Sequence, residues 1–295
     1  MVRPDAPRRG FRLRYLVAGL LLLALIVALV GCAGFMRDRL YEPGEGLAAV
    51  PQWIGAPPRE IIVTSGDGLR LAGYYWPPAA GEEDIVLVLH GRRDGYRRMA
   101  GYVERLTTSG RGVLVGSYRG FNENRGAPSQ TGLIADARAF YRYARVQAGA
   151  RGGVYVFGHS LGGAVAIQLA AREDLDGLVT LGTFTDIDAA APVYGEWLIP
   201  DKWRSDEALA DVEEPVLFIH GAIDDYITPD QSEALYAAAC APASIILLDG
   251  LMHRPNFRII GPLITGWIDA LEAGDVAGWR PEGTTRRESK PACGA

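Results

Sequence analysis

A tight turn at residues 158–163, Gly-His-Ser-Leu-Gly-Gly, most constrains how this chain can fold. It follows the apolar run 154–157 and precedes an alanine-rich stretch with helical spacing. A strand must therefore turn directly into a helix, and only glycines leave room for so close an approach of the two. The strain of such a turn raises Ser160 above the edge of a sheet. The backbone N–H of Leu161, at the start of the helix, then points towards any negative charge that forms beside Ser160.

Other apolar runs predict a sheet around this turn. The first two alternate and are separated by Ser-Gly-Asp-Gly, a hairpin signal, whereas the later ones are continuous, as in parallel strands buried on both faces. Helical patterns separate the later runs, which indicates βα units. We predict an α/β fold with a mostly parallel eight-stranded sheet, an N-terminal antiparallel hairpin and flanking helices. The predicted strands are Glu60–Thr64, Leu69–Trp76, Ile85–His90, Val113–Tyr118, Val154–His159, Leu178–Leu181, Val216–His220 and Ser244–Asp249.

A serine hydroxyl is a weak nucleophile and needs a neighbouring base, which a carboxylate in turn orients. The chain has four histidines. His253 follows the last predicted strand in a loop, which makes it the candidate base; the other three each end a predicted strand and suit structural roles. Asp224, after the strand ending at His220, is the first choice for the carboxylate, with Asp225 as the alternative. The order Ser160, Asp224, His253 is the one found in α/β hydrolases.

From about residue 60 to 272 the chain resembles the α/β-hydrolase superfamily, in particular small-lid serine esterases of the monoacylglycerol-lipase and prolyl-oligopeptidase branches. The resemblance is carried by the serine turn, His-Gly at 90–91, Tyr-Arg-Gly at 118–120 with Gly-Ala-Pro-Ser at 126–129, and His-Gly-x-x-Asp at 220–224. It implies an acyl-enzyme mechanism with the backbone N–H of Arg92 as the second oxyanion donor beside that of Leu161. It implies no metal and no cofactor.

The chain departs from these relatives beside the site. Arg92-Arg93-Asp94, with Arg97 and Arg98 beyond, replaces the small or amide residues usual after His-Gly, and either attracts anionic substrates or lipid headgroups or is a solvated basic face. The stretch 182–215 leaves room only for a short cap. We expect His90 and the cap residues Tyr194 and Trp197 to line the substrate pocket.

The amino terminus predicts membrane attachment. Residues 15–36 carry no charge, a length that spans a hydrocarbon core of ~30 Å, and arginines precede them. Leu-Val-Gly-Cys-Ala at 29–33 resembles the lipobox of bacterial lipoproteins, in which Cys32 would be lipidated; the alternative is a plain signal anchor. Both place the catalytic part outside the cytoplasm, attached to a membrane.

We therefore divide the chain into a signal peptide or anchor (1–31), a tether (32–58), a catalytic domain (59–272) and a disordered tail (273–295). Cys240 and Cys293 match no metal site, and with Cys293 in that tail we expect no disulfide. The net charge of −5 includes a basic N-terminal segment, so the remainder is more acidic still, which argues against nucleic-acid binding. We expect a monomer.

Together these features predict a membrane-tethered, extracytoplasmic serine hydrolase, a carboxylesterase of small-to-medium acyl esters. The alternatives are a thioesterase, peptidase or acyltransferase using the same three residues, or a catalytically silent binding protein with this fold.

Overall fold

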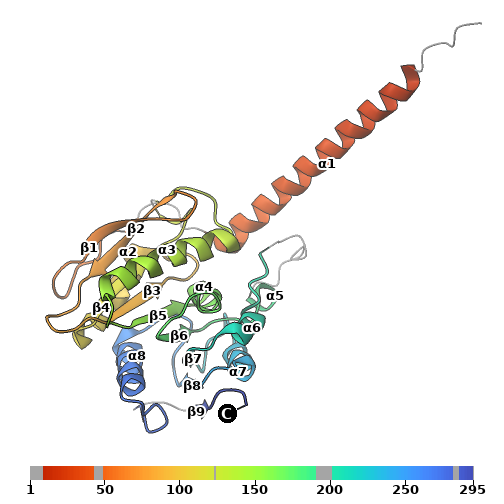
Figure 1. Cartoon of the computed structure of the whole chain (residues 1–295). Helices are drawn as coiled ribbons and strands as arrows, with labels where there is room; N and C mark the ends of the chain where they lie inside the picture. The colour runs from red at the N-terminus through yellow and green to blue at the C-terminus, as the bar shows by residue number, and fades with distance from the viewer. Residues whose placement is uncertain (1–8, 43–48, 123, 191–200, 282–285, 295) are drawn as a thin grey trace, which may run out of the picture.

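The structure, a computed structural model, describes residues 9–42, 49–122, 124–190, 201–281 and 286–294. Its centre is a nine-stranded sheet with the spatial order β1-β2-β4-β3-β5-β6-β7-β8-β9 (Figure 1). The strands are β1 (Arg59–Thr64), β2 (Arg70–Trp76), β3 (Ile85–Leu89), β4 (Gly112–Gly116), β5 (Val154–His159), β6 (Gly177–Leu181), β7 (Val216–Gly221), β8 (Ala243–Leu248) and β9 (Arg286–Lys290).

The middle of the sheet is parallel. Strands β3 to β8 pair in parallel with their neighbours, whereas β1 pairs antiparallel with β2, and β2 with β4. Strands β3 to β7 are buried along their whole length, which is why their sequences are continuous apolar runs. The predicted fold, a mostly parallel sheet with an antiparallel N-terminal hairpin, is confirmed, but the sheet has nine strands and not the predicted eight. Because parallel strands end at the same edge, the loops after the six strands β3 to β8 meet there.

Helices cover both faces of the sheet. One hydrophobic cluster joins α3, α4 and α7 to one face, and a second joins α2 and α8 to the other. The helices are α1 (Arg9–Tyr41), α2 (Tyr96–Val103), α3 (Gln130–Ala148), α4 (Leu161–Ala170), α5 (Ile187–Ala190), α6 (Ser205–Ala208), α7 (Pro229–Ala238) and α8 (Phe257–Glu272), with 3₁₀ turns at Glu104–Ser109 and Leu209–Asp211.

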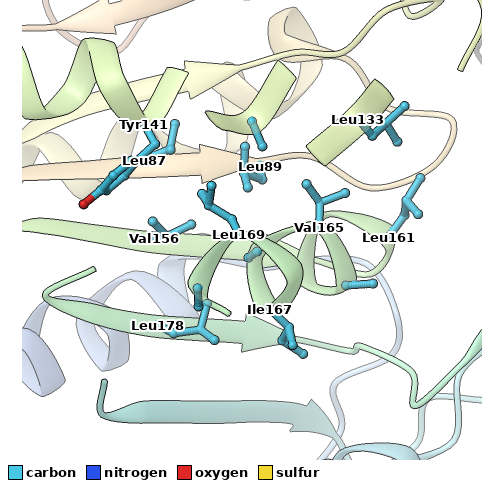
Figure 2. Packing of buried hydrophobic residues seen from close by; sticks show 14 of the residues in the cluster. Leu87, Leu89, Leu133, Tyr141, Val156, Leu161, Val165, Ile167, Leu169 and Leu178 are labelled. Carbon is cyan, nitrogen blue, oxygen red and sulfur yellow. The ribbon is translucent and has the colours of Figure 1, made fainter. Parts of the chain in front are cut away.

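Helix α4, which follows the serine turn, is buried along its whole length. Figure 2 shows its side chains Val165 and Leu169 packed among Leu87 of β3, Val156 of β5 and other apolar groups. Each such side chain contributes roughly 1.5–3 kcal/mol through burial. This packing fixes the helix N-terminus at the carboxyl edge of β5.

Helix α1 has two environments. Most of it projects away from the domain (Figure 1), and within the described residues it alone is long and apolar enough to cross a membrane. Its last turn is different, since Met36, Leu40 and Tyr41 are buried in the larger hydrophobic cluster. Residues 32–41, the first ten of the expected tether, instead continue the helix, and Met36, Leu40 and Tyr41 among them pack on the domain.

The C-terminal segment also differs from expectation. Strand β9 pairs antiparallel with β8, and Cys240 and Cys293 form a disulfide. The expected disordered tail is thus wrong for residues 286–294, and the expected absence of a disulfide is wrong. The sequence there is short and charged, so its strand depends on the neighbour: β9 covers the otherwise unpaired edge of β8.

The disulfide leads to a stability prediction. Cys293→Ser in the full chain, or reduction with dithiothreitol, should destabilise the domain by about 2–4 kcal/mol, because the bond closes a long loop in the unfolded chain. Thermal unfolding of the detergent-solubilised protein measures this. Cys32→Ser is the matched control, because Cys32 forms no disulfide, and the melting temperature of this variant should not change. Equal melting temperatures for wild type and Cys293→Ser would contradict the prediction.

Candidate active site

Ser160 occupies the strained turn between β5 and α4. Its φ is 54° and its ψ −119°, a region that residues with a side chain rarely adopt. A Cβ added at Gly158 would collide with the backbone of Gly162, and one at Gly162 with the carbonyl of Leu89. The glycines of the motif are thus required by close approach of backbone to backbone, as the sequence predicted. The backbone N–H of Ser160 donates to the carbonyl of Leu181 at 2.9 Å, which ties the turn to β6.

His253 and Asp224 complete a chain of hydrogen bonds from Ser160. Ser160 Oγ lies 3.0 Å from His253 Nε2, and His253 Nδ1 lies 2.7 Å from Asp224 Oδ2. With the imidazole proton on Nδ1, the ring donates to the carboxylate and Nε2 accepts from the serine hydroxyl. Asp225, the alternative acid, is exposed, and it is Asp224 that contacts His253.

The environment of Asp224 favours its ionised form. Burial alone would raise its pKa, but hydrogen bonds from His220 and His253 outweigh burial and lower it well below the ordinary value. The backbone N–H groups of Tyr226 and Ile227 also donate to Oδ1, both at 3.0 Å. Asp224 therefore stays negatively charged and can stabilise a positively charged imidazole at His253.

The other three histidines hold the loops that carry the site. His159 Nε2 donates to the backbone carbonyl of His253 at 2.9 Å. His220 Nε2 lies 2.8 Å from the carbonyl of Ile227, in the loop of Asp224, and His90 Nε2 lies 3.1 Å from Ser117 Oγ. These are the structural roles that their positions at strand ends indicated. The hydrogen bond between His159 and the His253 loop joins segments far apart in sequence, so no local sequence pattern could predict it.

The loop after β3, which we call the oxyanion loop (Gly91–Asp94), packs directly on the serine turn. A Cβ added at Gly91 would lie 3.3 Å from Ser160 Cβ, so a larger residue there would crowd the serine. This contact brings the backbone of Arg92 close to Ser160. Leu161 is the first residue of α4, where backbone N–H groups lack intrahelical partners. Both expected oxyanion donors thus lie on segments that flank the serine.

A charged cavity of about 480 Å³ opens above the three residues. Besides Ser160 and His253, it is lined by Arg92, Asp94, Arg98, Tyr226 and Arg254, with others. Asp94 is mostly buried, and burial raises its pKa to about 6, although electrostatic interactions with Arg98, His253 and Arg254 oppose that rise.

A second, narrow cavity of about 30 Å³, the apolar slot, also reaches Ser160 and shares Arg92 and Tyr226 with the charged cavity. Its walls include Leu40, Leu161, Phe184, Ile187 and Ile227. Leu40 belongs to the last turn of α1, which the sequence did not connect with the site. The slot has no contact with His253 among its lining residues, in contrast to the charged cavity.

The structure gives different outcomes for the three residues that were expected to line the substrate pocket. His90 is fully buried beneath the oxyanion loop, against Tyr118 and Phe121, and does not line either cavity; this expectation is wrong, because its ring is used to hold the loop. Tyr194 and Trp197 lie outside the described residues, as do residues 191–200 of the stretch in which a short cap was expected. Within the described parts of the chain, no group of three His, Cys, Asp or Glu side chains is placed to hold a metal ion.

Comparisons with known proteins agree with this architecture. The family described as Serine aminopeptidase, S33 (Hydrolase_4) matches residues 81–204. The protein Rv2307c of Mycobacterium tuberculosis is 34% identical over 244 residues, covering 78% of this chain and 86% of that protein. The lysophosphatidylserine lipase ABHD12 of Danio rerio is 30% identical over 201 residues, covering 59% and 52%. The esterase Pf2001 of Pyrococcus furiosus shares the fold, with a TM-score of 0.62, 17% identity, and coverage of 79% of this chain and 100% of its own.

The fold and the converging strand ends are those of an α/β hydrolase. The chain therefore belongs to the Hydrolase_4 family of α/β hydrolases, and the similarity to Rv2307c extends over most of its length. The resemblance inferred from the sequence motifs is confirmed, and with it the assignment to the hydrolases.

The buried carboxyl of Asp94 leads to a pH-dependent prediction. Its folded pKa of about 6 lies above the ordinary value, so the ionised form costs stability as pH rises through 6, and nothing below about pH 4, where it is protonated in both states. Asp94→Asn should therefore stabilise the domain at pH 8, on the order of 1–3 kcal/mol, but not at pH 4. Thermal unfolding at the two pH values measures the difference.

Asp67→Asn provides a control in which the expected change in stability at pH 8 has the opposite sign. A hydrogen bond from Arg119 lowers the pKa of this exposed carboxyl, so its ionised form stabilises the fold above its ordinary pKa. Removing that charge should lower the melting temperature at pH 8. A stabilisation by Asp94→Asn that is equal at pH 4 and pH 8 would show that ionisation is not its cause.

Proposed function

We propose that this protein is a serine hydrolase, a carboxylesterase with Ser160 as nucleophile and His253 as base. Asp224 is the carboxylate that orients the base. The observation that carries the proposal is the continuous hydrogen-bonded chain from Ser160 Oγ through His253 to Asp224, at 3.0 and 2.7 Å, on a strained turn. Those distances are within the reach needed for proton transfer.

The mechanism follows from the positions of these groups. Ser160 Oγ attacks the ester carbonyl as His253 Nε2 takes its proton, and Asp224 stabilises the resulting imidazolium. The backbone N–H groups of Leu161 and Arg92 stabilise the oxyanion. His253 then returns the proton to the leaving alcohol, and a water activated by the same imidazole releases the acid from the acyl-enzyme.

The positions of the two cavities suggest which part of the ester binds in each cavity, the alcohol or the acyl group. The leaving alcohol receives its proton from His253, so it belongs in the charged cavity, which His253 lines. The acyl group then belongs in the apolar slot, whose small volume suits short acyl chains. The names of two similar proteins, an esterase and a lysophosphatidylserine lipase, support an ester as substrate.

Amides are alternative substrates for the same residues, because the family is described as a serine aminopeptidase. Thioesters are a further alternative, because the same acyl transfer to a serine cleaves them. All three substrate classes pass through an acyl-enzyme at Ser160. A panel of p-nitrophenyl esters, thioesters and peptide anilides separates them, and we expect the esters to be turned over fastest.

The test of the catalytic assignment uses the full chain in detergent. Ser160→Ala and His253→Ala should each abolish labelling by a fluorophosphonate and lower kcat for p-nitrophenyl acetate by at least about 10³-fold, because nucleophile and base act as a unit. Asp224→Asn should lower kcat strongly, whereas Asp225→Asn should leave it unchanged. Retained labelling in Ser160→Ala would refute the proposal, and a folded wild type that does not label would favour a binding protein.

We further propose that α1 attaches the protein to a membrane with the catalytic domain outside the cytoplasm. The support is its uncharged, exposed stretch preceded by arginines. Two forms of attachment fit this proposal: an intact anchor helix, or lipid on Cys32 after cleavage before it.

Fractionation of cells producing wild type and Cys32→Ser tests the attachment. We expect wild type in the membrane fraction, resistant to carbonate extraction. If lipid is used, Cys32→Ser should lose the diacylglyceryl mass and keep its uncleaved N-terminus; if the helix is the anchor, wild type and variant should both have the unmodified full-length mass. Wild type in the soluble fraction would contradict membrane attachment altogether.

A further inference from the structure

The last turn of α1 is packed as part of the catalytic domain rather than as a tether. Met36 is 8% exposed, Leu40 5% and Tyr41 0%, whereas Phe35 on the same turn is 62% exposed. One side of this turn therefore faces the domain while the other faces solvent. Burial of three apolar side chains fixes the turn against the domain.

Hydrogen bonds between polar side chains also fix the position of the last turn of α1. The carboxylate of Asp201, itself buried, accepts hydrogen bonds from Arg37 Nε at 2.8 Å and from Tyr41 Oη at 3.0 Å. The indole N–H of Trp203 donates to Tyr41 Oη at 3.2 Å, and the two rings meet edge to face. A buried charge held by two partners permits little movement, because any shift would leave it unpaired.

The same turn contacts the oxyanion loop. Arg92 Nη1 donates to the backbone carbonyl of Leu40 at 3.2 Å, and Arg93 pairs with Glu42 just beyond the helix. A carbonyl in the last turn of a helix has no intrahelical partner and attracts a cation. Leu40 is thereby fixed beside Ser160 through its backbone, while its side chain forms a wall of the apolar slot together with Phe184, Ile187 and Ile227.

We propose that the last turn of α1 is part of the substrate site, with Leu40 as a specificity-determining residue that closes the acyl side of the slot and limits the length of the acyl chain. The inference rests on the proposed serine hydrolase activity and on the assignment of the slot to the acyl group. It adds a residue that lies outside the expected catalytic domain (59–272). This residue also lies outside residues 81–204, which the family match covers.

The test compares acyl-chain profiles of the full chain in detergent micelles. Wild type, Leu40→Ala and Leu40→Phe are assayed for kcat/KM on p-nitrophenyl esters from acetate to octanoate. Leu40→Ala should raise the ratio of octanoate to acetate kcat/KM by about tenfold or more, because each methylene accommodated in an apolar pocket is worth about 10–200-fold. Leu40→Phe should lower that ratio.

Met36→Ala is the matched control. Met36 is buried on the same turn but does not line the slot, so its truncation should lower the melting temperature without changing the ratio. An equal shift in Met36→Ala would show that the docking of the helix, and not the side chain of Leu40, sets the profile, and would overturn the inference.

The other outcomes separate this inference from the proposed function. An active, fluorophosphonate-labelled wild type whose chain-length profile is the same in both Leu40 variants overturns the role of Leu40 alone. A folded wild type that neither labels nor hydrolyses any ester overturns the proposed function and this inference with it.

Discussion

The strained backbone at Ser160 is the constraint on which the rest of the site depends. A positive φ at a serine costs about 1–3 kcal/mol, and it persists only where surrounding structure enforces it. Here the enforcement comes from the burial of α4 on one side and the hydrogen bond from Ser160 N–H to Leu181 on the other. The strain therefore falls on the residue whose hydroxyl must stand clear of the sheet, at the edge where six loops meet.

Two of the buried histidines, His90 and His159, are neutral, and His159 holds the loop that carries His253. Burial lowers the pKa of His90 to about 4 and that of His159 to about 3, so both rings are uncharged near neutral pH. A neutral His159 donates to the carbonyl of His253 without placing a positive charge beside it. The imidazolium that forms at His253 in the proposed mechanism is then not opposed by a positive charge on His159, and it is stabilised by Asp224.

Much of the fold followed from the sequence, because each predicted strand and the serine turn have a local pattern. The eight predicted strands lie within two residues of the observed ones, and Ser160, Asp224 and His253 come together because parallel strands end at one edge. What the sequence did not predict depends on partners distant in the chain. Strand β9 exists because β8 offers an unpaired edge, and Leu40 reaches the slot because Asp201, more than 150 residues away, holds the end of α1.

Of the arginines in the oxyanion loop and at the start of α2, Arg92, Arg93 and Arg97 show the same dependence on distant partners. The sequence allowed two interpretations of these arginines, an attraction for anionic substrates or a solvated basic face. In the structure the arginines also make contacts within the protein. Arg92 and Arg93 bind the end of α1, Arg97 lies 3.9 Å from Glu60, and Arg98 lies 3.8 Å from Asp94. Because these charges are already partnered within the protein, an anionic substrate would have to compete with Asp94 or Glu42 for them. Their first contribution is structural: they connect the helix that carries the proposed membrane anchor to the loop that carries a proposed oxyanion donor.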